Sequence, residues 1–327
     1  MNRPLSAPDL MASFPFPYTG DSYRYSTNIS PAAVVVATET GQWGRAVIDI
    51  DSEYTHELAE RRRILAADPS RHAALPHMRI ACWDTMLALM TELATAYPAT
   101  MSLTRDGERW QWCNELLGIT QDFVIGDESS LPCDPLAYIA DQVQEDIVLL
   151  DQRDGDLFAD AGVVTFAAGW SFGFDVGMTF LEIHGPVPRL RETGVITRAR
   201  EFLMRLQAGE VYRRTNWSMT VGRRLDVSTE TFPEWLPDRN HLDLLDDETF
   251  GRLIHLRVEV QHLIRLPESG SICFLIRSYM LPLADIATVP PWRERMAAVL
   301  AELPDDMAEY KGLSPFRDRA VSWLRAR

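Results

Sequence analysis

One histidine stands out because the chain around it is stiff. His184 ends an apolar run at residues 178–183, and two prolines, Pro186 and Pro188, follow it. Proline fixes its own φ angle and pushes the preceding residue towards extended backbone, so the backbone that follows this imidazole is conformationally restricted. A fixed imidazole suits an axial metal ligand, whereas a lone histidine is more commonly a structural residue hydrogen-bonded at a strand end. The local sequence leaves both interpretations open.

Residue spacing elsewhere does not favour a zinc, hydrolase or Schiff-base site. The seven histidines form no His-x-x-x-His pair, and strand alternation places His255 and His262 on opposite faces. Heme needs only one axial imidazole, because the porphyrin supplies the other four nitrogens. Neither a Gly-x-Ser-x-Gly elbow nor a dinucleotide fingerprint is present. Lys311 is the only lysine, and Cys113 and Cys273 are expected to be inert buried thiols.

Arginines on predicted strands give a second chemical signal. Arg214, Arg257 and Arg277 all lie on such strands, where an inward-facing guanidinium requires a carboxylate or a ligand anion. An ion pair with Glu259 or another acid is the commoner outcome. The alternative partner is a heme propionate, so these arginines are compatible with either an internal ion pair or a cofactor pocket.

An antiparallel sheet is expected to position these residues. Strands are predicted at residues 147–150, 162–167, 211–221, 255–265 and 272–279. The turn dipeptide Asp154-Gly155 joins the first two as a hairpin, and a Pro- and Gly-containing turn joins the last two.

Two of these strands carry a polar stripe. In residues 211–221, side-chain alternation places Arg214 and Asn216 on one side and Trp217 on the other. In residues 255–265, the polar side is formed by Arg257, Glu259 and Gln261.

Helices are predicted towards both ends of the chain. Helical spacing and caps indicate helices at residues 53–66, 78–97, 134–145, 196–206 and 291–303, and one that begins at Ser314. The three arginines at positions 61–63 are expected to be solvated. Hairpin-connected strands between helical ends predict the α+β class with an antiparallel sheet.

The composition excludes several functions. The 327 residues are 46% hydrophobic and 24% charged, as in an ordinary globular protein, and carry a net charge of −15. Such an acidic chain is repelled by nucleic acid and by anionic membranes. Four scattered cysteines indicate a reducing compartment, and no apolar run reaches the roughly 18 residues of a membrane span. We therefore expect a cytoplasmic protein.

Several segments, taken together, resemble a known family. They are Val-Gln-Glu-Asp at 143–146, Ile-His-Gly-Pro-Val-Pro at 183–188, Arg-Thr-Asn-Trp-Ser at 214–218, Leu-Pro-Glu-Ser-Gly at 266–270 and Phe-Leu-Ile-Arg-Ser-Tyr at 274–279. In the same order they resemble the heme-dependent oxidative N-demethylases, whose catalytic subunit has a PAS-like heme domain. Residues 14–24 and 60–63 are also similar to that family, so the resemblance extends to about residue 283.

The resemblance implies a heme b monooxygenase that uses dioxygen to oxidise a small secondary or tertiary amine at its N-methyl carbon, releasing formaldehyde. Electrons are expected from NADPH through FMN and an iron-sulfur cluster on separate reductase subunits. By matched position, His184 becomes the axial iron ligand and Arg214 a residue of the heme or substrate pocket, supported by Asn216 and Trp217. The remaining pocket or propionate candidates are Arg257, Glu259, Gln261 and Arg277.

This chain also departs from the family pattern. Residues 170–178 are rich in Gly and Phe where the family is expected to have a basic helical stretch, and Val260 stands where an arginine is usual. Both differences leave the substrate and the partner surface open.

The expected organisation is one compact unit with three parts. These are an N-terminal arm and helical region (1–133), a PAS-like heme-binding core (134–285) and C-terminal helices (286–327). Two other functions remain open, a PAS-type heme sensor and a heme-free interaction subunit of a larger complex, and the sequence is compatible with a homo-oligomer.

Overall fold

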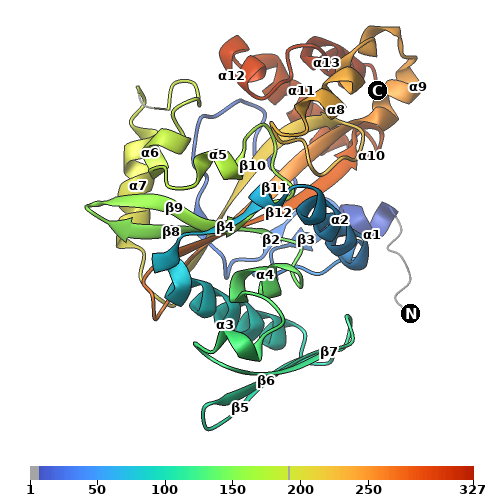
Figure 1. Cartoon of the computed structure of the whole chain (residues 1–327). Coiled ribbons are helices and arrows are strands. Elements are labelled where there is room, and N and C mark those ends of the chain that lie inside the picture. The colour runs from blue at the N-terminus through green and yellow to red at the C-terminus, as the bar shows by residue number, and fades with distance from the viewer. Residues whose placement is uncertain (1–6, 191) are drawn as a thin grey trace.

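A seven-stranded antiparallel sheet lies at the centre of the protein (Figure 1). The structure is a computed structural model that describes residues 7–190 and 192–327. Across the sheet the strands are β1 (Ser30–Pro31), β10 (Val211–Val221), β11 (Ile254–Arg265), β12 (Ile272–Pro282), β8 (Asp146–Arg153), β9 (Asp156–Val163) and β4 (His72–Ala74). Every neighbouring pair is antiparallel, which confirms the α+β class with an antiparallel sheet.

The two predicted hairpins form the middle of this sheet. Asp154 and Gly155 join β8 to β9 with φ angles of 52° and 73°, the left-handed conformation that both central residues of a type I′ turn require. The turn between β11 and β12 is closed by the Leu266 N–H, which donates to the Ser271 carbonyl at 2.9 Å. Edge strands β1 and β4 come from the N-terminal part of the chain, so the sheet extends beyond the predicted 134–285 core.

Helices flank the sheet on both faces. They are α1 (Ala7–Ser13), α2 (Tyr54–Ala67), α3 (Arg79–Ala96), α4 (Pro135–Ala140), α5 (Phe172–Asp175), α6 (Phe180–Ile183), α7 (Val195–Arg205), α8 (Phe232–Trp235), α9 (Asp247–Leu253), α10 (Leu283–Ile286), α11 (Pro290–Glu302), α12 (Asp305–Tyr310) and α13 (Arg317–Arg325). Asp134 accepts a hydrogen bond from the Ala137 N–H at 3.0 Å, so the predicted cap of α4 is confirmed, although this helix ends before its predicted limit.

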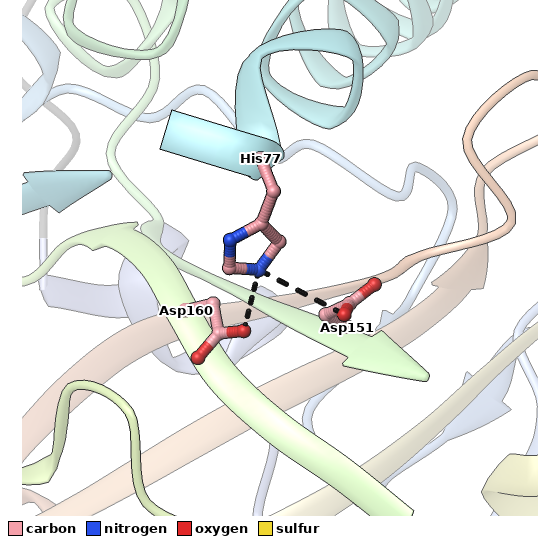
Figure 2. A group of neighbouring side chains, drawn as sticks. All are labelled: His77, Asp151 and Asp160. Carbon is pink, nitrogen blue, oxygen red and sulfur yellow. Dashed lines mark hydrogen bonds and ion pairs between the residues drawn. The ribbon is translucent and has the colours of Figure 1, made fainter. Parts of the chain in front are cut away.

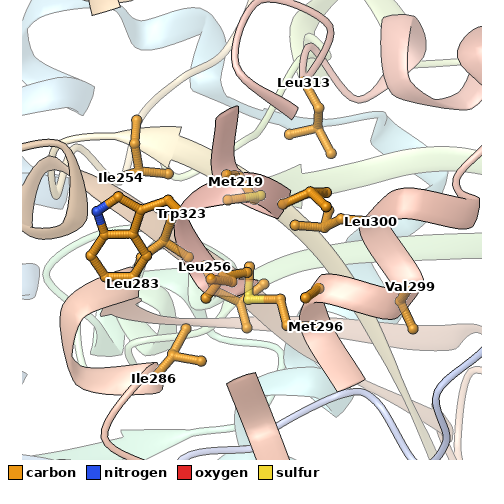
Figure 3. Packing of buried hydrophobic residues seen from close by; sticks show 14 of the residues in the cluster. Met219, Ile254, Leu256, Leu283, Ile286, Met296, Val299, Leu300, Leu313 and Trp323 are labelled. Atoms are coloured by element: carbon orange, nitrogen blue, oxygen red, sulfur yellow. The ribbon is translucent and has the colours of Figure 1, made fainter. Parts of the chain in front are cut away.

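Helices α9, α10, α11 and α13 gather over one end of strands β10 to β12 (Figure 1). Figure 3 shows Met296 and Leu300 of α11 and Trp323 of α13 packed with Met219 and Leu256 of the sheet. All five side chains are buried. The C-terminal helices are therefore anchored on the sheet by an apolar core.

A second, three-stranded sheet covers the other end of the same face together with α3 and α4. Its strands are β5 (Met101–Asp106), β6 (Arg109–Asn114) and β7 (Ile119–Val124). Its core includes Trp112 and Phe123, which are packed in one cluster with Ile147 and Leu275 of the central sheet. None of these three strands was predicted from the sequence.

The opposite face of the central sheet is covered by α5, α6 and α7. Val148 and Leu263 face this side, because strand side chains alternate, and they share a buried cluster with Leu203 of α7 and Phe172 of α5. Figure 1 shows these helices beside β8 and β9, away from the three-stranded sheet. The polar stripe of β10 and β11 lies on this second face.

The structure corrects the expectation that all three arginines at 61–63 are solvated. The Arg63 side chain is 65% exposed, whereas that of Arg61 is fully buried. Arg61 donates to the carbonyls of Ala140 and Val143 at 2.6 Å each, and to the Asp146 carboxylate at 3.1 Å. The residue therefore fixes the segment between α4 and β8.

Candidate functional site

The polar stripe is a connected network on the second face of the sheet. Pairing of β10 with β11 places Arg214 opposite Gln261 and Asn216 opposite Glu259. The Glu259 carboxylate accepts hydrogen bonds from Gln261 Nε2 at 3.0 Å and from Asn216 Nδ2 at 3.3 Å. The Arg257 Nε also donates to it, at 3.3 Å. The structure thus brings together five predicted site residues of these two strands.

His184 is the first residue after α6, so the expectation of a strand end at this position is wrong. A capping box between Thr179 and Glu182 starts this short helix, and His184 forms its C-cap. The His184 Nδ1 lies 2.8 Å from the Phe180 carbonyl oxygen, which can only accept, so Nδ1 carries the proton. The Phe180 ring packs against the imidazole with centroids 4.3 Å apart. The ring is therefore held with Nε2 as the nitrogen that carries a lone pair.

The electrostatic surroundings of His184 keep its imidazole neutral. Burial of this half-buried side chain lowers its pKa to about 4, the Phe180 carbonyl opposes that shift, and the nearby Arg214 guanidinium adds to it. A neutral imidazole with a proton on Nδ1 is the form that binds a metal through Nε2. Within the described residues, His184 Nε2 has no hydrogen-bond partner.

We predict that His184 of the heme-free protein stays neutral, with its proton on Nδ1, from about pH 8 down to about pH 5. An ordinary histidine, with a pKa near 6.5, is roughly 97% protonated at about pH 5. Histidine-selective nitrogen NMR measures the tautomer and the charge, and the signal missing from His184→Ala identifies the residue. A titration midpoint near pH 6.5 would contradict the prediction. Because the unfolded chain binds this proton more readily, His184 makes stability fall as pH drops from about 6.5 towards 4.

Arg214 is a cation on this face that forms neither an ion pair nor a hydrogen bond with any described residue. Its Nε is buried and makes no hydrogen bond with any described residue. Burial lowers its pKa, and Glu259, Tyr25 and Tyr310 are close enough to raise it in part. Leaving a buried guanidinium nitrogen without a partner is costly, so this position favours the binding of an external anion.

Two other predicted site residues lie away from His184. Arg277 projects from the opposite face of the sheet, where its guanidinium pairs with Asp51 at 2.6 Å and with Glu57 at 2.8 Å. The Trp217 ring is also on that face and packs edge-on against Tyr18, with centroids 5.2 Å apart. The structure therefore places Arg277 and Trp217 on the opposite face of the sheet from the polar stripe, and it does not bring them together with the other predicted site residues.

Arg257 lies on the correct face, but its guanidinium is used internally. It is fully buried and donates to the Leu225 carbonyl at 2.7 Å and to Ser278 Oγ at 2.7 Å, in addition to the bond with Glu259. It also donates to the Phe166 carbonyl at 2.5 Å. Two outcomes were expected for this arginine, an internal ion pair or a cofactor carboxylate. The structure shows the internal ion pair, which is the commoner one.

A further polar cluster could not be found from sequence spacing. Figure 2 shows His77, just before α3, directed at Asp160 and Asp151 of the β8–β9 hairpin. His77 Nε2 lies 2.8 Å from Asp160 Oδ2 and 3.8 Å from Asp151 Oδ2. The Arg153 guanidinium contacts both carboxylates and already supplies the positive charge that a metal ion would bring. We interpret the cluster as an ion-pair network that fixes the hairpin.

The fold and the site define an α+β protein with a constrained neutral histidine and an unpaired arginine on one face of an antiparallel sheet. Residues 40–321 match the family model described as haem-dependent oxidative N-demethylase, alpha subunit-like. The chain belongs to this family, as its motifs predicted, and the family is one of heme-dependent oxidative enzymes. Among the described helices, none has both the length and the apolar character needed to cross a membrane.

Proposed function

We propose that this chain is the heme-binding catalytic subunit of a monooxygenase that removes the N-methyl group of a small amine. The observation that carries the proposal is the state of His184, a neutral imidazole whose Nδ1–H is bound to the Phe180 carbonyl and whose Nε2 is free among the described residues. A backbone carbonyl behind the ring is the usual second partner of a metal-bound histidine. Family membership supplies the identity of the metal group.

The residues of the second sheet face fit a heme. His184 Nε2 would bind the iron, and the unpaired Arg214 would receive a propionate. When bound, the heme supplies the redox chemistry that activates dioxygen. Arg257 holds Glu259, which also accepts from Asn216 and Gln261, so these side chains form a rigid part of the sheet face. This face of the sheet would be the PAS-like heme site expected from the resemblance.

The electrons would come from other subunits. All four cysteines of this chain are free, and no group of cysteines among the described residues has metal-ligand geometry. We therefore assign the expected flavin and iron-sulfur cluster, and the NADPH that reduces them, to partner subunits in the cytoplasm. The description as an alpha subunit is in keeping with such a division.

The test is turnover by the heme-loaded chain with a chemical or enzymatic electron donor, dioxygen and a small methylated amine. Formaldehyde and the demethylated amine should form in equal amounts, and neither should form with His184→Ala. If heme binds at His184 but no amine is consumed with any donor, the heme-sensor alternative replaces this proposal. If heme does not bind at all, the chain is an interaction subunit.

A further inference from the structure

We propose that Lys311, together with Arg214, receives the two carboxylates of the bound heme. The inference rests on the proposed heme function and adds a cofactor-binding residue that lies in none of the motifs. Its basis is the arrangement of positive charges on the second face of the sheet and at its β10 edge.

Most other arginines near this face are already satisfied. Arg257 donates to Glu259 and to backbone carbonyls, as described above. Arg265, further along β11, donates to the carbonyls of Leu206 at 2.8 Å and Leu203 at 2.9 Å. Neither guanidinium is free to meet a ligand carboxylate.

Lys311 is different because no described carboxylate lies within ion-pair distance of it. It follows α12 directly and reaches the exposed edge of β10, where its Nζ donates to the Trp217 carbonyl at 2.6 Å. A second, longer contact of 3.4 Å joins Nζ to Asn216 Oδ1, and the Trp217 ring centroid is 4.7 Å away. These direct partners are neutral, so the ammonium has no ion pair among the described residues, and Glu259 acts on it only from a longer distance.

Lys311 and Arg214 lie near the same position on β10. Asn216, which Lys311 contacts, is two residues from Arg214 on the same side of the strand, a separation of about 7 Å along the backbone. Burial is the main cause that lowers the pKa of Lys311 to about 8, and Arg214 lowers it further while Glu259 opposes the shift. Two neighbouring cations without ion pairs are mutually unfavourable, so a ligand with two negative charges would stabilise both.

The side-chain chemistry makes the assignment specific. A lysine ammonium is a compact charge on a flexible stem, so it can turn from the Trp217 carbonyl towards a carboxylate without moving α12. The Nζ–H that makes only the longer contact with Asn216 Oδ1 can donate to a ligand carboxylate instead. Arginine at the same position would keep the positive charge. Methionine would keep the length and the apolar stem of the side chain but remove the positive charge.

The test compares heme with its dimethyl ester, in which both carboxylates are neutral, by Soret titration of the full-length heme-free protein. Loss of one charge-assisted hydrogen bond should weaken heme binding in Lys311→Met by roughly 10- to 100-fold. Lys311→Arg should restore most of it. Wild type should bind the ester weakly, and Lys311→Met should bind it as wild type does. Arg252→Met, which removes a 62% exposed charge on α9, is the control and should bind heme normally.

The outcomes separate this inference from the proposed function. Equal affinity of the wild-type protein for heme and for its dimethyl ester would overturn the carboxylate role. This comparison needs no variant, so it remains decisive even if Lys311→Met misfolds. Unchanged heme affinity in Lys311→Met would also overturn it. If wild type shows no His184-dependent Soret band, the proposed function itself fails.

Discussion

His184→Ala is expected to abolish axial ligation of heme. The substitution removes the neutral imidazole whose Nε2 is free among the described residues, while the Phe180 carbonyl to which Nδ1 donates loses only a half-buried partner. Heme affinity should fall by two orders of magnitude or more, because a coordinate bond is lost. Removing a residue that only hydrogen-bonds a metal ligand already costs about 10- to 100-fold in metal affinity. Soret titration and the ligand-field bands of the ferric protein measure this effect.

The chain offers a matched control for this variant. His255 is also bound through Nδ1 to a backbone carbonyl, that of Leu253 at 2.8 Å, and its pKa is likewise lowered by burial. His255→Ala should keep the heme spectrum. Added free imidazole should restore a six-coordinate or five-coordinate imidazole spectrum to His184→Ala. Retention of the wild-type spectrum by His184→Ala, or its loss in His255→Ala, would assign the ligand elsewhere.

Arg61→Met is expected to have the largest effect on stability. It leaves the Asp146 carboxylate buried without its cation and removes the donors to Ala140 and Val143 carbonyls. Removal of one partner from a buried ion pair costs about 3–5 kcal/mol in the free energy of unfolding. Chemical denaturation followed by circular dichroism measures the change.

Arg63→Met is the matched control, because it makes the same substitution two residues later on the exposed side of α2. Arg63 pairs with Glu60 on the surface, so about 1 kcal/mol or less is expected. Burial raises the pKa of Asp146, and protonation of Asp146 would relieve the unpaired charge in Arg61→Met. The loss in free energy of unfolding of Arg61→Met, relative to Arg63→Met, should therefore become smaller as pH falls towards 4. Equal stability of the two variants would refute the structural role of Arg61.

The central strands could be predicted from the sequence because their signals are local. Alternation over 211–221 and 255–265 fixed which side chains share a face, and Asp154-Gly155 marked the hairpin turn. Alternation places these side chains on one face, but the pairing of Arg214 with Gln261 and of Asn216 with Glu259 is set by the register of the two strands. The polar stripe was therefore predictable before any tertiary contact was known.

Other features depend on tertiary contacts that no local pattern encodes. Helical spacing left Arg61 indistinguishable from Arg63, and only the carbonyls of the segment before β8 decide which one is buried. The strands β5 to β7 had usable signals in Gly107 and Gly118, which lie in the two turns between them and have φ angles of 61° and 66°. Lys311 could not be linked to β10 because 94 residues separate it from Trp217.

The position of the predicted arginines shows the same limit. Strand periodicity gave their faces, but it could not say which guanidinium already has partners. Arg277 is neutralised by Asp51 and Glu57 from the N-terminal part of the chain, and those contacts span more than 200 residues. Arg214 alone among the three predicted arginines has a buried Nε without a partner while facing the His184 side of the sheet.

The most direct test of the central claim is a titration of the purified, heme-free chain with ferric heme, followed in the visible spectrum. If this chain holds heme through His184, a Soret band should grow and saturate at one heme per chain. The ferrous protein should then show the bands of a histidine-ligated heme b. An unchanged free-heme spectrum, or one that never saturates, would contradict the account and leave His184 as a structural histidine.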